Sequence, residues 1–302
     1  MPEKILITGG SGLIGRKLTE VLLQNGYEVA WLSRNTGNTG VKTFKWNITD
    51  GSIDPAAVEW ADHIVHLAGA NIFEKKWTKE FKKEIIESRT KTADLLVNAI
   101  AASSKKPSTF ISASGISYYG VDTKDKLLTE ESPAGDGFLA EVVMQWESAA
   151  DKVAAMNIRV VKLRIGIVLA AEGGALEKML DAIKKGIGAP LGSGKQYISW
   201  IHIKDICRMF VKAIEDKSIS GIYNGVGPAP VTNEEMTKAL AKKLGKSILM
   251  PNVPSFALKM MLGAERASIV LGGNKVSSEK IEKTGFQFQY TNLASALDDL
   301  IR

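Results

Sequence analysis

Three glycines near the start of the chain have the spacing of a phosphate-binding turn. Gly9, Gly12 and Gly15 follow a short β-like apolar run and lead directly into a helical pattern. The first glycine permits a tight turn, the second lets backbone N–H groups approach a pyrophosphate, and the third lets the helix pack closely. The helix N-terminus adds unpaired N–H donors and partial positive charge. Unless this is a plain tight turn, we expect these glycines, with Leu13 and Ile14, to contact a dinucleotide cofactor.

The residues at the end of the second predicted strand indicate which dinucleotide binds. An Asp or Glu there would accept hydrogen bonds from the adenosine ribose and repel a 2′-phosphate. The chain instead has Ser33 and Arg34, and a guanidinium pairs bidentately with a phosphate. We therefore expect NADP(H) rather than NAD(H), the alternative being that Arg34 is only a solvated charge. Small residues after a later strand, Leu67, Ala68 and Gly69, are expected to line the adenine–ribose side.

Strand-like and helix-like segments alternate through roughly residue 165, and these elements must position the candidate residues. Extended runs are expected at 4–8, 28–34, 41–47, 63–69, 108–114 and 158–166, with helices at 13–25, 76–104 and 137–156. Such alternation favours a parallel sheet covered by helices on both faces. We predict an α/β protein with a Rossmann doubly wound sheet in residues 1–166, to which 197–225 return. A smaller C-terminal α/β lobe is expected over 167–302, with helices near 175–186, 233–244 and 255–271.

Composition and charge narrow the classes of function. The 302 residues are 45% hydrophobic, enough for a large core, and carry a formal net charge of +6. The lysines are spread over many segments and mixed with glutamates, which favours solvated surface and no nucleic-acid partner. The single cysteine, Cys207, cannot form an intrachain disulfide and fits a reducing compartment.

The sequence also shows no pattern typical of a targeting segment, a membrane span or a metal site. The first strand begins at residue 4, which leaves no room for a signal peptide, and no apolar run approaches a membrane span. We therefore expect a cytoplasmic protein with no membrane partner. The histidines at 63, 66 and 202 lack metal-ligand spacing, so no metal site is expected.

The sequence resembles the extended short-chain dehydrogenases/reductases, a superfamily that includes sugar-nucleotide epimerases and dehydratases. Its opening TGGSGLIG matches the superfamily pattern Thr-Gly-x-x-Gly-x-x-Gly. More narrowly, it is similar to the atypical epimerase-like NADP-binding oxidoreductases of the NAD-dependent epimerase/dehydratase family, which end in a small domain of unknown function. The segments that carry this similarity span nearly the whole chain and are LSR at 32–34, HLAGANI at 66–72, ESRTKTADLL at 87–96, SASGISYYG at 112–120, FLAEVVMQWE at 138–147, LRIGIVL at 163–169, GSGKQYISWIHIKD at 192–205 and LGGNKVSSEKIEKTGFQF at 271–288.

The resemblance also indicates what the chain lacks. Members of the superfamily normally use a Ser or Thr after the fifth strand and a Tyr-x-x-x-Lys pair on the following helix, with the Tyr as acid/base. In many extended members a Glu follows that Lys by four residues. Aligning Glu147 with that Glu places Val143 at the lysine and Leu139 at the tyrosine. The usual proton-transfer pair is absent, which argues against ordinary epimerase chemistry.

Several polar residues remain near the expected nicotinamide end. Ser114 or Ser117 could take the role of the usual serine, and Tyr118 or Tyr119 could supply a phenol. The alternative is that all are loop residues bonded to backbone. We predict Ser114, Ser117 and Tyr119 as the catalytic candidates.

The resemblance implies further contacts on either side of the nicotinamide. Glu84 and Arg89 are expected to face the cofactor, the alternative being a surface pair. Arg164 ends the sixth strand, where ligands bind in sheets of this kind. Further substrate contacts are expected in the glycine-rich loop and are Gln196, Trp200 and His202.

We therefore expect an NADP(H)-dependent oxidoreductase whose small substrate lies between the nucleotide domain and the C-terminal lobe. Its chemistry would be hydride transfer from the nicotinamide. One alternative is a non-catalytic NADPH-binding sensor or regulatory protein, which the missing Tyr and Lys favour and the retained polar loop at 192–202 disfavours. A second is a nucleotide-sugar epimerase with relocated acid/base groups. The sequence leaves the oligomeric state open, a homodimer included.

Overall fold

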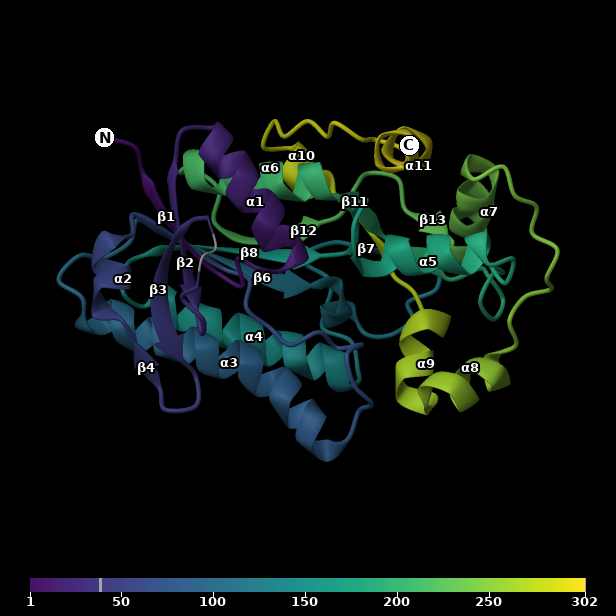
Figure 1. Cartoon of the computed structure of the whole chain (residues 1–302), viewed down its shortest axis with the longest axis horizontal. Coiled ribbons are helices and arrows are strands. Elements are labelled where there is room, and N and C mark those ends of the chain that lie inside the picture. The colour runs from purple at the N-terminus through teal and green to yellow at the C-terminus, as the bar shows by residue number, and fades with distance from the viewer. Residues whose placement is uncertain (38–39, 302) are drawn as a thin grey trace. The chain divides into compact units, whose positions relative to one another are not determined.

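Figure 1 shows the computed structural model of the chain, which describes residues 1–37 and 40–301. The chain forms two compact units from interleaved segments. Unit 1 comprises Met1–Ser114, Val142–Leu163 and Cys207–Ile222, and unit 2 comprises Gly115–Glu141, Arg164–Ile206 and Tyr223–Arg302. Because the chain passes repeatedly from one to the other, neither unit is a continuous stretch of sequence.

An eight-stranded sheet provides the frame of unit 1, in the order β12-β8-β6-β5-β1-β2-β3-β4. Its strands are β1 (Lys4–Thr8), β2 (Glu28–Ser33), β3 (Lys42–Asn47), β4 (Ser52–Ile53), β5 (His63–His66), β6 (Thr109–Gly115), β8 (Arg159–Ile165) and β12 (Gly221–Gly225). β1 pairs in parallel with β2 and with β5, whereas the short β4 runs antiparallel to β3. This is the strand order of a Rossmann sheet, whose two halves meet between β1 and β5. The predicted fold class is confirmed.

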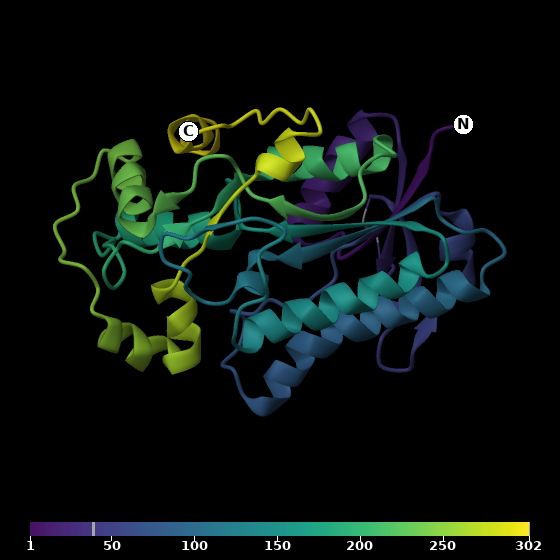
Figure 2. The ribbon, with the colours of Figure 1, turned by 180° about the vertical axis from the view of Figure 1, so that it is seen from behind.

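Helices cover both faces of this sheet (Figure 2). α1 (Leu13–Gln24) and α6 (Ile203–Glu215) lie on one face, and α2 (Pro55–Trp60), α3 (Lys79–Ala102) and α4 (Phe138–Ala154) lie on the other. On α3, buried apolar residues recur at helical spacing, for example Leu96 and Ile100. They pack with Leu6, Ile64 and Phe110 of the central strands in one hydrophobic core. The core therefore fixes β1 and β5, the strands that deliver the candidate cofactor residues.

Unit 2 is built around a core of its own. Its elements are β7 (Leu127–Leu128), β9 (Ile167–Leu169), α5 (Gly174–Lys184), β10 (Tyr197–Ile198), β11 (Trp200–His202), β13 (Val231–Thr232), α7 (Asn233–Lys243), α8 (Ser255–Leu262), α9 (Ala264–Leu271), β14 (Lys275–Val276), α10 (Glu279–Glu282), α11 (Leu293–Leu300) and the 3₁₀ turn Ile116–Tyr119. The short strands pair two by two: β9 with β11, β10 with β13 and β7 with β14. Leu180, Leu240 and Leu297, from three helices, pack together in this core with Trp200.

The helix predicted over 255–271 is in fact two helices. Gly263 separates α8 from α9 with a φ of +82°, a conformation that glycine adopts without the steric cost of a side chain. The short β4 and α2 were not anticipated from the sequence. None of the helices in the described ranges is long and apolar enough to cross a lipid bilayer.

Candidate functional site

The turn from β1 into α1 is so tightly packed at Gly9, Gly10 and Gly15 that a Cβ has no room at these positions. A Cβ on Gly15 would lie 2.4 Å from the carbonyl oxygen of Gly9, and a Cβ on Gly10 would lie 2.5 Å from the Trp31 ring. Gly9 itself has a φ of +69°, and a Cβ there would lie 2.9 Å from the carbonyl carbon of Leu67. The glycine turn therefore rests directly on the backbone that follows β5. Gly10 is a required glycine that the three-glycine motif did not single out.

The N-terminus of α1 offers backbone donors to a ligand. Gly12 caps the helix in an extended conformation without a side-chain cap, and the first turn contains no acidic residue. The amides of Leu13 and Ile14 have no acceptor among residues 1–37 and 40–301. Gly12 is exposed, and a Cβ on it would approach the Gly9 oxygen at 3.2 Å. This cradle fits the diphosphate of a dinucleotide, because free N–H groups and the helix dipole stabilise an anion.

Thr8, at the end of β1, ties the glycine turn to the residues after β5. Its Oγ1 accepts the N–H groups of Leu67 and Ala68, each at 3.1 Å, and lies 2.8 Å from Nδ1 of His66. Both acceptor positions of the hydroxyl are then occupied, so its proton is donated to Nδ1. We infer that His66 carries its own proton on Nε2, which lies 3.3 Å from Thr92 Oγ1. A neutral histidine is therefore built into this junction.

Acid should destabilise the protein through its buried histidines. Burial lowers the pKa of His66 from 6.5 to about 4, and burial also lowers the pKa of His202 to about 4. Between about pH 4 and pH 6.5 the unfolded chain binds more protons than the folded chain, because its histidines are protonated and the buried ones are not. The contribution of the neutral histidines to the unfolding free energy is therefore complete above about pH 6.5 and is lost as the pH falls towards 4. His66 alone accounts for about 3 kcal/mol of it.

Urea denaturation at a series of pH values measures this dependence. We expect the unfolding free energy to decline steadily below about pH 6.5, and His66→Gln, which cannot be protonated, to show a shallower decline. Equal slopes for the two proteins would contradict the neutral state inferred for His66.

The loop after β5 rests on a buried arginine. Arg89 of α3 donates to the carbonyl oxygens of Ile85 at 2.9 Å and Ala70 at 3.1 Å. Its guanidinium lies 5.0 Å from the centroid of the Trp146 ring, and burial lowers the pKa of Arg89 to about 10. A Cβ on Gly69 would lie 3.0 Å from Arg89 Cζ. Arg89 therefore supports the backbone predicted to line the ribose, and its direct contact with a cofactor stays a prediction.

Ser33 and Arg34 lie at the carboxyl end of β2, where the sequence places them. Ser33 is half-buried and Arg34 is exposed. Arg34 makes no hydrogen bond or ion pair with the described part of the chain, so its guanidinium is available to a ligand. Glu84 is half exposed and pairs with Lys75 at 3.2 Å. The predicted contact between Glu84 and a cofactor is untested by this geometry.

Ser114, a predicted catalytic residue, is bonded to a buried carboxyl group. It lies near the end of β6, and its hydroxyl donates to Oε1 of Glu147 on α4 at 2.6 Å. Both side chains are buried, as is Val143, one turn earlier on α4. A valine thus occupies the position that the superfamily resemblance gives to lysine, while the serine is held by an acid.

Tyr119, another catalytic candidate, belongs to a polar cluster within unit 2. Its hydroxyl donates to Oδ1 of Asn224 at 2.7 Å and accepts from Nη1 of Arg164 at 3.2 Å. The Arg164 guanidinium lies 3.3 Å from the centroid of the Tyr118 ring, and Glu130 accepts the N–H of Asn224 at 2.7 Å. Burial raises the pKa of Tyr119. The phenol is accordingly protonated at neutral pH, with its proton directed at Asn224.

The remaining candidates occupy different surroundings. Ser117 is half-buried, and its hydroxyl has no hydrogen-bond partner among the described residues. Trp200 is buried and donates from Nε1 to the oxygen of Ala229 at 2.8 Å. The His202 ring stacks on Tyr290 with centroids 3.7 Å apart. Substrate contacts by Trp200 and His202 therefore stay predictions without geometric support.

Gln196 is the loop residue that retains unused hydrogen-bonding capacity. Its amide nitrogen donates to the oxygens of Leu191 and Val270, each at 3.0 Å. Its Oε1 is buried and has no partner in the part of the chain that the structure describes. A buried acceptor left unpaired is costly, so Oε1 is a candidate acceptor for a ligand donor.

The strand order, the glycine turn and the open amides of α1 define unit 1 as a dinucleotide-binding Rossmann unit. The chain belongs to the NAD dependent epimerase/dehydratase family, whose model matches residues 5–225. Residues 253–300 match a domain of unknown function, DUF1731. The family resemblance predicted from the sequence is confirmed.

Curated relatives match over nearly the full chain. Human epimerase family protein SDR39U1 is 34% identical, over 99% of this chain and 99% of its own. Epimerase family protein ML0860 of Mycobacterium leprae is 36% identical, over 97% of this chain and 94% of its own. The chloroplastic SDR39U1 homolog of Arabidopsis thaliana is 36% identical, over 97% of this chain and 85% of its own.

Solved structures agree with the family. The crystal structure of human SDR39U1 with NADPH has a TM-score of 0.88 and 33% identity, and the match covers 98% of both chains. A UDP-glucuronic acid 4-epimerase from Bacillus cereus, in complex with UDP-glucuronic acid and NAD, has a TM-score of 0.77 at 23% identity, over 98% of this chain and 96% of its own. The second likeness bears on the fold alone.

Proposed function

We propose that the protein is an NADP(H)-dependent oxidoreductase of the atypical extended short-chain dehydrogenase/reductase type, acting on a small organic substrate. The observation that carries this proposal is the cradle at the start of α1, where the exposed Gly12 and the free amides of Leu13 and Ile14 meet no acidic side chain. The human relative crystallised with NADPH supports the choice of cofactor.

Each part of unit 1 has a separate task in this proposal. The amides of Leu13 and Ile14 would bind the diphosphate, and Arg34 would pair with the 2′-phosphate. The backbone of Leu67 and Ala68, fixed by Thr8, would line the adenosine ribose. When bound, NADPH supplies a hydride from its nicotinamide ring.

Reduction of a substrate also requires a proton, and Ser114 is the residue best placed to hold one. Its hydroxyl donates to Glu147 at 2.6 Å, so Ser114 can pass its proton to a substrate when Glu147 carries a proton of its own, which then moves to the serine oxygen and leaves a carboxylate. The Tyr119 hydroxyl donates instead to the amide oxygen of Asn224, which has no proton to return. We therefore prefer Ser114 over Tyr119 as the proton donor, with Ser117 as the other candidate.

Replacing Arg34 tests the choice of nucleotide. Arg34→Ala should weaken NADPH binding by about 2 kcal/mol, roughly 30-fold, because charge-assisted bonds to the 2′-phosphate are lost. NADH, which lacks this phosphate, should bind unchanged. The unfolding free energy should also stay within about 0.5 kcal/mol of the wild type, since the side chain is exposed and unpaired in the described chain. Titration calorimetry with both nucleotides measures the difference, and equal losses would refute the NADP(H) assignment.

A second candidate function is a non-catalytic NADPH-binding sensor or regulatory protein, favoured by the apolar Val143 at the usual lysine position. A panel of carbonyl compounds and nucleotide sugars, assayed by NADPH oxidation, separates the two. Turnover that Ser114→Ala abolishes at unchanged NADPH affinity would support the oxidoreductase. Tight NADPH binding without turnover on any compound would support the sensor.

A further inference from the structure

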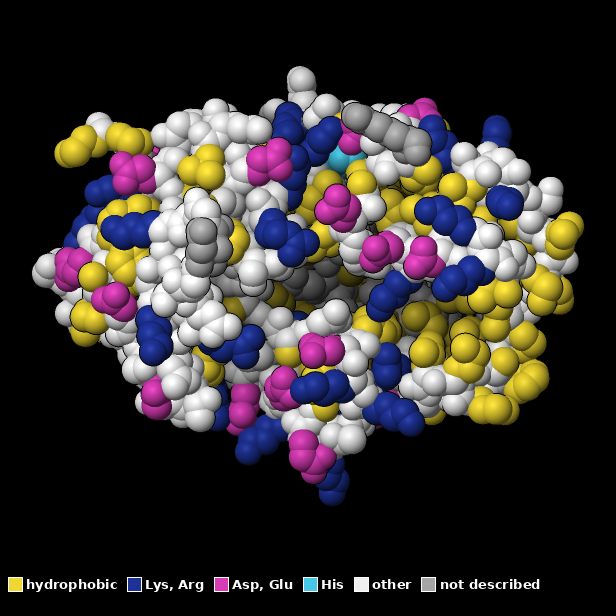
Figure 3. Space-filling model, viewed as in Figure 1, with side chains coloured by type: hydrophobic (Ala, Val, Ile, Leu, Met, Phe, Trp, Pro, Cys, Tyr) yellow, Lys and Arg dark blue, Asp and Glu magenta, His cyan; other side chains and the backbone are white. Residues whose placement is uncertain are grey.

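One surface of unit 2 exposes apolar side chains that folded proteins normally bury. Ten large hydrophobic residues are exposed among those described, and five of them lie within 249–261. We call these five the apolar ridge: Leu249, Met250, Phe256, Met260 and Met261. Figure 3 shows hydrophobic side chains gathered over the region of α8 and α9. A concentration of this kind marks an interaction surface.

The ridge projects into solvent to an unusual degree. Leu249 is 87% exposed, Met260 is 80% exposed and Phe256 is 68% exposed. Phe256 and Met260 are four residues apart on α8 and therefore share one face of that helix, while Leu258 on the same helix is buried. Side chains that stand out this far offer little flat area to a rigid partner, but they can enter a fluid apolar phase.

Lysines accompany the ridge, and no carboxylate lies between its residues along the sequence. Between Glu235 and Glu265 the sequence contains no Asp or Glu, and its lysines there are Lys238, Lys242, Lys243, Lys246 and Lys259. Two of the five pair with acids elsewhere in unit 2. Lys242, Lys246 and Lys259 have no acidic partner in the described ranges. This stretch therefore carries uncompensated positive charge beside its apolar side chains.

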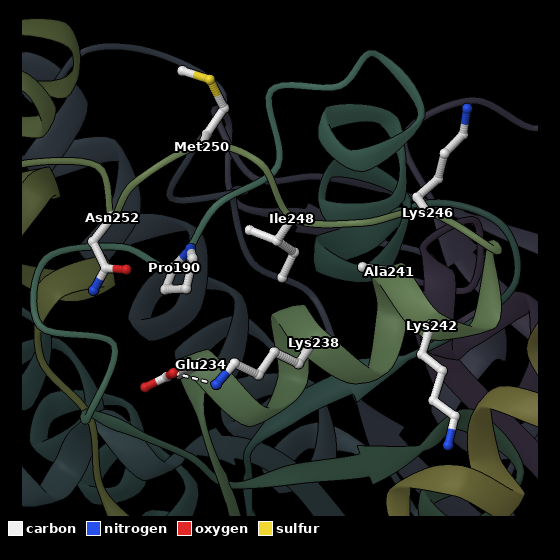
Figure 4. Close-up of a pocket in the computed structure, with 9 residues that line it drawn as sticks. All are labelled: Pro190, Glu234, Lys238, Ala241, Lys242, Lys246, Ile248, Met250 and Asn252. Atoms are coloured by element: carbon white, nitrogen blue, oxygen red, sulfur yellow. Dashed lines mark hydrogen bonds and ion pairs between the residues drawn. The ribbon is translucent and has the colours of Figure 1, made fainter.

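A groove links the lysines to the ridge (Figure 4). It has a volume of about 410 Å³, and Lys238, Lys242 and Lys246 line it together with Ile248 and Met250. Glu234 also lines the groove and pairs with Lys238, which leaves Lys242 and Lys246 as its uncompensated cations. Met250 belongs to both the groove and the ridge. A phosphate attached to an apolar body would find cations and apolar side chains together here.

We propose that this surface docks on a membrane of anionic phospholipid. The ridge enters the boundary between headgroups and acyl chains, and Lys242, Lys246 and Lys259 pair with lipid phosphates. Such docking is peripheral and needs no spanning helix. A second copy of the chain fits less well, because a two-fold interface would bring two surfaces of net positive charge face to face.

Vesicle flotation of the full chain tests the proposal. We expect binding to phosphatidylcholine vesicles that contain phosphatidylglycerol, no binding to pure phosphatidylcholine, and release by high salt. Lys242→Ala with Lys246→Ala should weaken binding about 30-fold, because each lysine near an anionic surface contributes roughly fivefold. Phe256→Ser with Met260→Ser should weaken it at least about tenfold.

Control variants in unit 1 test whether vesicle binding depends on this particular surface or only on the overall charge and hydrophobicity of the protein. Lys79→Ala with Lys217→Ala removes the same charge from unit 1, and Leu23→Ser removes an exposed apolar residue there. Both should float like the wild type, and all variants should bind NADPH equally. The proposal is overturned by absence of binding to the anionic vesicles, by equal loss in the matched variants, or by full binding of the ridge variant. Ridge-dependent dimerisation, or capture of an acidic protein, without vesicle binding would also overturn it.

Discussion

Replacing Gly15 by alanine should destabilise the whole N-terminal βα unit. The added Cβ would lie 2.4 Å from the Gly9 oxygen and 2.7 Å from Gly10 Cα, and both are backbone atoms that cannot rotate away. Relief requires α1 to move off the sheet, which separates the buried Leu18 and Leu22 from their neighbours. We expect a loss of about 3 kcal/mol or more in the free energy of unfolding. Urea denaturation measures it directly.

Gly12 provides the matched control for Gly15. A Cβ there approaches the Gly9 oxygen at 3.2 Å, a contact that a shift of a few tenths of an ångström relieves, and the residue is exposed. Gly12→Val should therefore lose less unfolding free energy than Gly15→Ala yet lose NADPH binding, because its side chain fills the diphosphate cradle. Wild-type stability in Gly15→Ala would contradict the tight packing. Wild-type NADPH affinity in Gly12→Val would place the diphosphate elsewhere.

The contrast between these glycines shows what the sequence could and could not predict. The three-glycine motif is local: its spacing alone dictates a turn between a strand and a helix, and the structure has that turn. The requirement at Gly10 comes instead from the Trp31 ring, 2.5 Å from a Cβ at that position. The motif contains no information on this contact, because Trp31 is brought there by the pairing of β1 with β2.

Unit 2 was harder to predict for the same physical reason. Asp205 is a residue type that often caps a helix N-terminus, but α6 begins at Ile203 and the Asp205 carboxylate accepts the N–H groups of Gln289 and Tyr290, each at 2.9 Å. Trp200, predicted to contact the substrate, is buried and donates to the oxygen of Ala229, and its substrate contact stays a prediction. The hydrogen bonds of Asp205 and Trp200 are made with partners distant in sequence. Aspartate and tryptophan occur both in buried hydrogen-bond networks and in binding sites, so the residue type alone does not distinguish the two.

The catalytic candidates illustrate a further limit of sequence reasoning. The sequence correctly showed that the Tyr-x-x-x-Lys pair is absent from α4, but it could not rank the polar residues that remain. The structure distinguishes them by their partners, because Ser114 donates to Glu147 whereas Tyr119 donates to Asn224. The sequence shows which side chains are able to transfer a proton. The hydrogen bonds in the structure show which of these side chains is the better proton donor.

Thr8→Val should be among the most damaging isosteric changes in unit 1. The methyl group that replaces the hydroxyl can neither accept from Leu67 and Ala68 nor donate to His66 Nδ1. His66 is fully buried, whereas the Leu67 amide keeps the backbone oxygen of residue 8 as a second acceptor at 3.2 Å. We expect a loss of about 3 kcal/mol in unfolding free energy, together with weaker NADPH binding.

Thr8→Ser isolates the hydroxyl from the shape of the side chain. It keeps the donor and both acceptor positions and deletes one buried methyl group, which costs about 1 kcal/mol. NADPH affinity should then stay near that of the wild type. The nitrogen spectrum of the His66 ring gives an independent readout, since donation from Thr8 requires the proton on Nε2. A wild-type protein with that proton on Nδ1, or equal stability of the valine and serine variants, would show that Thr8 does not join β1 to the loop after β5 in this way.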